Sequence, residues 1–304
     1  MSPHPHAPIA SSQVPGWMVA AANDRPYSSE NGRGTLNLID GAAAARAAAA
    51  IRDGRSLSLA RPLSADDFTV RDGVTPYTHE LEYVESPDGV GWGLSDVRLV
   101  PHGLQNTHLD ALNHVAIDRT FYGGRPVDAA FQGSVDVLAA SGVVVRAVYV
   151  DIPAVHGTAW AEREVTGDDI DAALDAAGVV FERGDALCVD MGRDRYEAAT
   201  GRMLGGPESA DDAGGGLAES GARWVADHGV SVLAWDMLDS RDAKAAHATA
   251  HILGWAIGLP LVDNCDFSGL RRELGGTAIA GTLVLAPLAV PGANGMNLNP
   301  LILR

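Results

Sequence analysis

A strong strand signal lies at Val143–Ile152, a nearly continuous apolar run rich in β-branched residues between Gly142 and Pro153. Such a run is typical of a strand buried on both faces. The segment Gly34–Ile39 predicts an ordered loop or a short strand. Further short apolar segments bounded by turn residues predict strands at 56–60, 96–101, 186–191, 230–236, 261–264 and 282–288.

Apolar positions with helical spacing alternate with these strands. They predict helices at 41–52, 166–177, 217–228 and 247–257, and a segment at 107–118 that begins extended and turns into a helix. Asp40 is a suitable N-cap for the first helix, and Gly178 and Gly229 are suitable stops for the second and third. Because helices and strands alternate through the second half of the chain, the sequence predicts an α/β fold.

The sequence gives no sign of a second domain. No repeat of roughly 20–50 residues is visible, and no stretch rich in Gly, Pro or Ser divides the chain. The first residues are rich in Pro, His and Ser, a composition that favours disorder. We therefore expect a mobile tail at residues 1–16 and a single catalytic domain at residues 17–304.

Composition excludes several partners. The net charge of −17 and pI of about 4.8 disfavour nucleic acid and anionic membrane surfaces. No apolar run is long enough to span a bilayer, and the N-terminus lacks the features of a signal peptide. The two cysteines, Cys188 and Cys265, are too few for a disulfide framework or a thiolate zinc site and are interpreted as buried free thiols. We expect a cytoplasmic protein that acts on a small molecule.

The densest cluster of reactive side chains is His108, Asp110 and His114. In extended backbone a His-x-Asp pair projects from one face, and imidazole and carboxylate together suit a divalent metal ion. His114, four residues after Asp110, would point back to the same region from a helical turn, as a general base. The spacing alone fits equally well with ordinary hydrogen-bonded polar residues.

A second cluster comprises His247, His251 and Asp263. The two histidines are four residues apart on a predicted helix and so share a face. Their spacing matches that of metalloproteases, but the glutamate that would act as base is missing. Asp263 ends a short predicted strand, a common position for a functional residue.

Several segments together resemble one family. The run Thr107-His108-Leu109-Asp110-Ala111-Leu112-Asn113-His114 resembles the HxGTHxDxxxH motif of the cyclase family, which includes bacterial kynurenine formamidases and isatin hydrolase. Other signatures follow the family's order along the chain, namely Gly34–Ile39, Phe121–Gly124, Val262–Asp266, Val284–Leu288 and Asn299-Pro300. The resemblance implies a kynurenine-formamidase-like fold of the swivelling β/β/α type, a single domain with a mixed-sheet or barrel-like core and flanking helices.

The resemblance also implies roles for individual residues. His108 and Asp110 match metal ligands, His114 matches the catalytic histidine, and His251 and Asp263 match the residues that complete the metal environment. The remaining pocket residues by this resemblance are Phe121, Tyr122, Asn106 and His247. The family further implies a homo-oligomer, a dimer or larger.

The chain departs from the family pattern at three positions. Leu104 replaces the first histidine of the motif, Asn106 replaces its glycine, and Asp263 stands where glutamate is common. With Leu104 unable to bind a metal, we expect one divalent ion, zinc or manganese, instead of two. His102, two residues earlier, is a possible replacement ligand.

The expected activity is hydrolysis of a C–N or C–O bond in a small amide, cyclic imide or lactone, by a metal-activated water with His114 as the base. Two alternatives remain open. One is a non-hydrolytic cyclase, dehydratase or isomerase of a secondary-metabolite, polyketide-type pathway. The other is a degenerate, metal-free binding protein.

Overall fold

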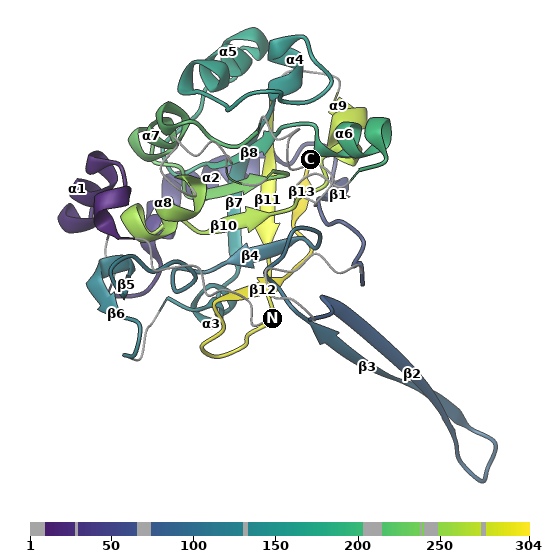
Figure 1. Ribbon diagram of the computed structural model, residues 1–304. Helices are drawn as coiled ribbons and strands as arrows, with labels where there is room; N and C mark the ends of the chain where they lie inside the picture. The colour runs from purple at the N-terminus through teal and green to yellow at the C-terminus, as the bar shows by residue number, and fades with distance from the viewer. Residues whose placement is uncertain are drawn as a thin grey trace.

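A strongly curled mixed sheet of nine strands forms the centre of the protein (Figure 1). The computed structural model describes residues 10–27, 30–65, 74–129, 133–202, 215–237, 239, 249–274 and 278–304. The strands, in spatial order, are β1 (Ser56–Ser58), β13 (Leu301–Leu303), β11 (Ala278–Leu285), β7 (Val143–Asp151), β8 (Ala186–Asp190), β9 (Val232–Trp235), β10 (Leu261–Asp263), β4 (His108–Asp110) and β12 (Gly295–Asn297). The pairs from β7 to β10 are parallel and the other pairs are antiparallel. In Figure 1, β7 and β11 run steeply whereas β4 and β10 lie across them.

The central strands are buried on both faces, because successive side chains pack into two different hydrophobic cores. On β7, Val148 and Val150 join the core beneath the helices, whereas Ala147 and Tyr149 join the core on the opposite face. The first core is covered by α1 (Gly16–Asp24), α5 (Gly167–Ala177), α7 (Glu219–Asp227) and α8 (Thr249–Ile257). The prediction of an α/β fold with a curled mixed sheet and flanking helices is confirmed.

The remaining helices complete the fold. They are η1 (Ser11–Gln13), η2 (Gly34–Leu38), α2 (Gly41–Ala50), η3 (Tyr122–Gly124), α3 (Val135–Ala139), α4 (Ile152–His156), α6 (Arg193–Thr200) and α9 (Ser268–Leu274). The predicted cap of α2 is present, since the Asp40 carboxylate accepts a hydrogen bond from the Ala43 amide at 2.9 Å. Of the tail expected at residues 1–16, positions 1–9 lie outside the described residues. Val14, within the expected tail, is buried, and so is Met18 just after it. Within the described ranges, no helix is long and apolar enough to cross a membrane.

The helix expected in the second half of segment 107–118 is absent; the chain makes turns there. After β4, the Ala111 and Leu112 amides donate to the carbonyls of Asn294 and Gly133, at 3.0 Å each. Asp118 then adopts a positive φ of 46°. The positive φ at Asp118 takes the backbone out of the helical region, so a helix cannot continue through this segment. His114 approaches Asp110 from a turn instead.

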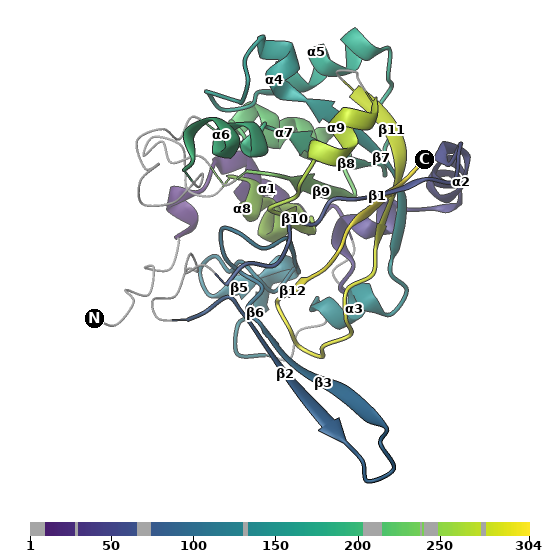
Figure 2. The ribbon, with the colours of Figure 1, turned by 90° about the vertical axis from the view of Figure 1, so that its right-hand side faces the viewer.

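Two hairpins lie outside the nine-stranded sheet. One is the short pair β5 (Thr120–Phe121) and β6 (Arg125–Pro126). The other joins β2 (Tyr77–Glu85) to β3 (Gly91–Leu99) and projects far from the body of the protein (Figures 1 and 2). The strand expected at 96–101 is therefore the end of a longer strand, β3.

The N-terminal cap of helix α5 gives a testable prediction about stability. Asp169 accepts hydrogen bonds from the Thr166 amide at 2.9 Å and from the Arg163 guanidinium at 2.7 and 2.8 Å. Burial alone would raise the pKa of this carboxyl, but these donors outweigh burial and lower it. We expect Asp169→Asn to reduce the free energy of unfolding by about 1–2 kcal/mol at neutral pH, as loss of a capping interaction does.

The penalty of Asp169→Asn should depend on pH. A lowered pKa in the folded state stabilises the protein above the unfolded pKa, and that stability is lost as pH falls through the folded value. Chemical denaturation should therefore show the penalty shrinking below about pH 4. Asp168→Asn, the same change at the exposed neighbouring position, is the control. An equal penalty in both variants, or one independent of pH, would contradict this account.

Candidate metal centre

Asp110 lies at the centre of a group of four histidines. Its Oδ1 is 3.3 Å from His102 Nε2 and 3.5 Å from His108 Nε2. Its Oδ2 is 3.4 Å from His251 Nε2 and 3.6 Å from His114 Nε2. Burial alone would raise the pKa of this carboxyl, but the imidazoles outweigh burial and hold it well below its usual range. Asp110 is therefore a buried anion among nitrogen donors.

Asp263 adds a second carboxylate to the group. Its Oδ2 is 3.1 Å from His251 Nε2 and 3.8 Å from His108 Nε2. Its Oδ1 accepts a hydrogen bond from the indole N–H of the buried Trp235. Because Asp263 on β10 pairs in register with His108 on β4, backbone pairing of two neighbouring strands sets this arrangement.

Strand β4 presents His108 and Asp110 on one face, as the spacing of the pair predicts. Leu109 between them is buried in the opposite core. The His108 Nδ1 lies 2.9 Å from the Asn106 carbonyl, which leaves Nε2 to face Asp110 and Asp263. The tautomer with the proton on Nδ1 satisfies that contact.

His102 reaches the group from the loop before β4. A Cβ at Gly295 on β12 would lie 2.3 Å from His102 Nε2, so only glycine leaves room for the ring. The loop is held by Asn264, whose side-chain amide donates to the carbonyls of Gly103 and Asn106 at 2.8 and 3.2 Å. The buried Arg193 donates to Asn264 Oδ1 at 2.6 Å and to the Leu104 carbonyl. Leu104, where the family motif has histidine, contributes its backbone, and His102 places an imidazole in the group.

His251 lies on α8 and contacts three carboxylates. Its Nδ1 pairs with Asp239 while its Nε2 faces Asp110 and Asp263. Burial alone would lower the pKa of this histidine, but the three carboxylates outweigh burial and raise it well above its usual value. A carboxylate behind a histidine in this way fixes the ring and makes the other nitrogen a better ligand.

His114 differs electrostatically from His251. Its ring stacks on His102, with centroids 4.1 Å apart and planes 12° apart. Burial lowers the pKa of His114 to about 4, against the opposing effect of Asp110. Its Nδ1 is buried without a hydrogen-bond partner among the described residues. His114 is thus a neutral imidazole at neutral pH.

The donor set fits a divalent metal ion. Both Asp110 oxygens and His102 Nε2 are buried without a hydrogen-bond partner in the described part of the chain. Such unsatisfied atoms are expensive unless another group, such as a cation, binds them. Two sets of ligand atoms, His102–Asp110–His114 and His108–Asp110–Asp263, each lie within 4.8 Å of one another. Imidazole nitrogens with carboxylate oxygens suit zinc or manganese.

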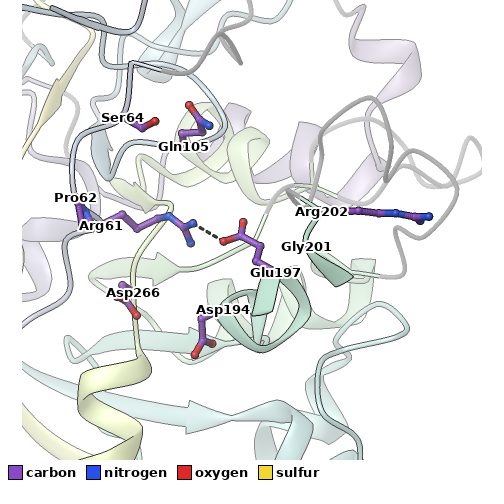
Figure 3. A pocket seen from close by; sticks show the side chains of 9 residues that line it. All are labelled: Arg61, Pro62, Ser64, Gln105, Asp194, Glu197, Gly201, Arg202 and Asp266. Atoms are coloured by element: carbon purple, nitrogen blue, oxygen red, sulfur yellow. Dashed lines mark hydrogen bonds and ion pairs between the residues drawn. The ribbon is translucent and has the colours of Figure 1, made fainter. Parts of the chain in front are cut away.

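A small cavity lies at this group, and a larger cavity is lined by other residues. A cavity of about 10 Å³, enough for about one water, is lined by Asp110, His114 and His251 and by apolar side chains that include Leu112 and Leu261. A larger cavity of about 420 Å³ is lined by none of the residues of this group, which are His102, His108, Asp110, His114, His251 and Asp263 (Figure 3). In that cavity, Arg61 is paired with Glu197.

The expected pocket residues have different positions. The Asn106 amide pairs with the Ser64 backbone, accepting from its N–H at 2.8 Å and donating to its carbonyl at 3.3 Å. The Tyr122 ring is fully buried and its hydroxyl donates to the Tyr27 carbonyl. These are the contacts that the structure gives the two side chains, and the assignment of Asn106, Phe121 and Tyr122 to the substrate pocket stays a prediction. His247 lies outside the described residues.

Comparison with known families identifies the family of the chain. The family model named Cyclase ("Putative cyclase") matches residues 45–240. The chain belongs to the cyclase family. No curated protein matches the chain.

Solved structures share the cyclase fold at low sequence identity. A novel cyclase is 21% identical with a TM-score of 0.75, over 91% of this chain and 96% of that chain. Isatin hydrolase A from Labrenzia aggregata, bound to benzyl benzoate, is 19% identical with a TM-score of 0.59, over 84% and 94%. An isatin hydrolase bound to the product analogue thioisatinate is 17% identical with a TM-score of 0.61, over 82% and 92%. At these identities the likeness establishes the fold.

Some residues around the donor group of this cyclase-family chain have no clear sequence signal. Asp239 and Arg193 lie in ordinary polar segments. Asp239 pairs with His251, 12 residues away, and Arg193 with Asn264, 71 residues away. The sequence around Trp235 does not show that its indole N–H would reach Asp263. Asn264 offers a weak signal, because it follows Asp263 and takes a positive φ of 57°, which asparagine tolerates better than most residues.

Proposed function

We propose that this protein is a metal-dependent hydrolase of small amides, cyclic imides or lactones. The observation that carries the proposal is the convergence of four imidazoles on Asp110, whose two oxygens are buried and lack a hydrogen-bond partner among the described residues. The isatin hydrolases of the same fold give the hydrolytic reaction as precedent.

The proposed ligands of one divalent ion, zinc or manganese, are His108, Asp110, His251 and Asp263, with His102 in place of the histidine that Leu104 replaces. Four of these come from β4, β10 and α8, and His102 comes from the loop that Arg193 and Asn264 hold. A divalent ion at such a site supplies Lewis acidity toward water and a substrate carbonyl. Asp239 is proposed to hold the His251 ring with Nε2 toward the ligand group.

His114 is proposed as the group that moves protons. It lines the small cavity next to Asp110, and its Nε2 faces the ligand group. It would accept a proton from the attacking water as the new C–O bond forms. It would return that proton to the leaving nitrogen or oxygen as the C–N or C–O bond of the substrate breaks. Leu112 and Leu261 border the same cavity and limit access of bulk water.

The test is hydrolysis in ¹⁸O-labelled water. The wild-type protein, loaded with zinc or manganese, is incubated with a cyclic amide, a cyclic imide and a lactone of similar size. We expect one ¹⁸O atom in the carboxylate of the product from at least one of them, and no turnover after metal removal. Conversion without ¹⁸O, or with loss of water, would overturn hydrolysis in favour of the cyclase, dehydratase or isomerase alternative.

A further inference from the structure

The cavity of about 420 Å³ has room for a small-molecule ligand, and none of the proposed metal ligands lines it (Figure 3). Its volume falls within the range of roughly 300–1,000 Å³ that is usual for ligand pockets. The lining carries charges of both signs, from Arg61, Arg202, Asp194, Glu197 and Asp266. Such a lining favours a charged ligand over an apolar one, because buried charges need partners.

Backbone pairing places two of the charged side chains on one face of the wall. Ala60 forms an antiparallel bridge with Cys265, and the Asp266 amide donates to the Leu59 carbonyl at 2.8 Å. Arg61 and Asp266 are therefore diagonal neighbours across this pairing, a relation in which side chains share a face about 7–8 Å apart. Both side chains line the cavity, so their relative position is set by the fold before any ligand binds.

Arg61 has hydrogen-bonding capacity to spare. One edge of its guanidinium, Nη2, donates to Glu197, and the two side chains are 21% and 20% exposed. Its Nε and Nη1 have no hydrogen-bond partner among the described residues. A guanidinium presents its N–H donors in a planar fork, and a carboxylate can accept two of them at once. Arg61 can therefore hold a carboxylate while its pair with Glu197 stays in place.

Asp266 has a spare acceptor. Its Oδ1 accepts a hydrogen bond from the Ser268 amide at 2.9 Å, whereas its Oδ2 has no partner within the described part of the chain. Asp194, by contrast, uses both oxygens to accept from Arg271 at 2.9 Å. Arg61 and Asp266 form no ion pair with each other. The cavity thus offers a cationic donor edge and an anionic acceptor that are close together but separate.

We propose that this cavity is a second binding site, for a small α-amino acid, whose carboxylate binds Arg61 and whose ammonium group binds Asp266. A simple anion would be repelled by the three carboxylates of the lining, and a simple cation by its two guanidinium groups. A zwitterion answers both signs at once. Ser64 and Gln105 also line the cavity, so a polar side chain on the ligand is favoured.

The bound amino acid would contact the loop that carries His102. Gln105 of that loop lines the cavity, and the Arg61 amide donates to Thr107 Oγ1 at 2.9 Å. The ligand is not placed as the substrate of the proposed hydrolysis, because none of the groups proposed to activate water lines the cavity. Its binding does not depend on a metal ion.

The test is isothermal titration calorimetry of the full-length protein with L-serine, because the proposed contacts are to groups that all α-amino acids share. Two analogues each lack one charge: 3-hydroxypropanoate has no ammonium group, and 2-aminoethanol has no carboxylate. We expect L-serine to bind at least about 10-fold more tightly than either analogue, as the loss of one hydrogen bond between charged groups predicts.

Two variants assign the contacts. Asp266→Asn keeps an acceptor for the Ser268 amide but loses the charge, so L-serine and 3-hydroxypropanoate should bind it equally. Arg61→Gln should likewise bind L-serine and 2-aminoethanol equally. Each variant is judged by the ratio of two ligands, which a general loss of structure does not produce. The matched control is Asp40→Asn, the same change at another capping aspartate, and it should keep both wild-type ratios.

Three results would overturn the proposal. The first is that L-serine does not bind. The second is that it binds no more tightly than its analogues; equal binding of 3-hydroxypropanoate would make the cavity a site for anions. The third is that Asp266→Asn and Arg61→Gln keep the wild-type ratios, which would place the amino acid elsewhere on the protein.

Discussion

Replacement of Asp110 by asparagine is expected to remove the metal ion from the purified protein and to reduce the rate of hydrolysis more than about 100-fold. Loss of a residue that only supports a ligand typically costs less than this. Asp110 is shared by both sets of candidate ligand atoms and faces all four histidines. Asparagine keeps the size but loses the charge that offsets a divalent cation. Elemental mass spectrometry should find about one zinc or manganese per wild-type chain and almost none in the variant.

Thermal unfolding gives a second measurement that does not depend on turnover. A ligand that binds only the folded state stabilises it by about 2.7 kcal/mol at a concentration 100 times its dissociation constant. Excess zinc should therefore raise the melting temperature of the wild type and leave that of Asp110→Asn unchanged. Without metal, Asp110→Asn also loses the attraction between the Asp110 carboxylate and the imidazoles around it. The response to zinc, and not the melting temperature of the metal-free protein, is therefore the measurement that reports metal binding.

Asp185→Asn is the control for a loss of folding. Asp185 is fully buried and accepts a hydrogen bond from Arg146 at 2.6 Å, far from the ligand group in the register of the sheet. Its replacement should cost about 1–3 kcal/mol of stability but keep the zinc response. A wild-type protein that binds neither zinc nor manganese, even in excess, would contradict the proposed hydrolase and favour the metal-free binding protein.

The sequence predicts those parts of the fold that depend on neighbouring residues. Helix α5 begins and ends where expected, because Thr166 and Asp169 form its capping box and Gly178 takes the left-handed conformation that ends it. The shared face of His108 and Asp110 follows in the same way from the period of a strand. The helix expected around His114 is absent. The chain makes turns there, and the Ala111 and Leu112 amides bond to residues 294 and 133, partners that no local pattern reveals.

The ligand group itself depends on contacts that span the chain. The sequence offers His102 as a possible ligand, but its approach requires the glycine at position 295 and the clamp from Arg193 through Asn264. Asp239 shows the same limit, since its pairing with His251 arises from the placement of α8 against the loop after β9. These positions are set by the curl of the sheet, and a single sequence does not show how far a sheet curls.

The long hairpin could have been predicted. Residues 79–83 alternate between the two faces of β2, and Pro87-Asp88-Gly89 is a strong turn signal between two strands. The apolar face of the hairpin, which carries Leu81 and Tyr83, was less obvious, because glutamates at alternate positions give the segment a polar appearance. Register, and with it the separation of Leu81 and Tyr83 from Glu80 and Glu82, becomes visible only when the two strands are paired.

His114→Gln is expected to lower kcat about 10²- to 10⁴-fold, the usual contribution of a positioned acid–base group, while the metal content stays at the wild-type level. Glutamine retains polarity and approximate size but cannot accept and return a proton. KM should change little, because the proposed role of His114 begins when the substrate bond is attacked. Steady-state kinetics on the metal-loaded protein, with metal analysis of the same samples, measures both quantities. His228→Gln is a control, because His228 stacks on Trp224 and should leave turnover unchanged.

The comparison with His102→Gln separates a base from a ligand. The two rings are stacked, and their Nε2 atoms lie at similar distances from Asp110, 3.6 Å for His114 and 3.3 Å for His102. Position alone therefore does not distinguish their roles. If His102 is the ligand that replaces the missing motif histidine, His102→Gln should weaken metal binding, whereas His114→Gln should not. Loss of the metal from His114→Gln would make His114 a ligand, and turnover within a few-fold of wild type would exclude it as the general base.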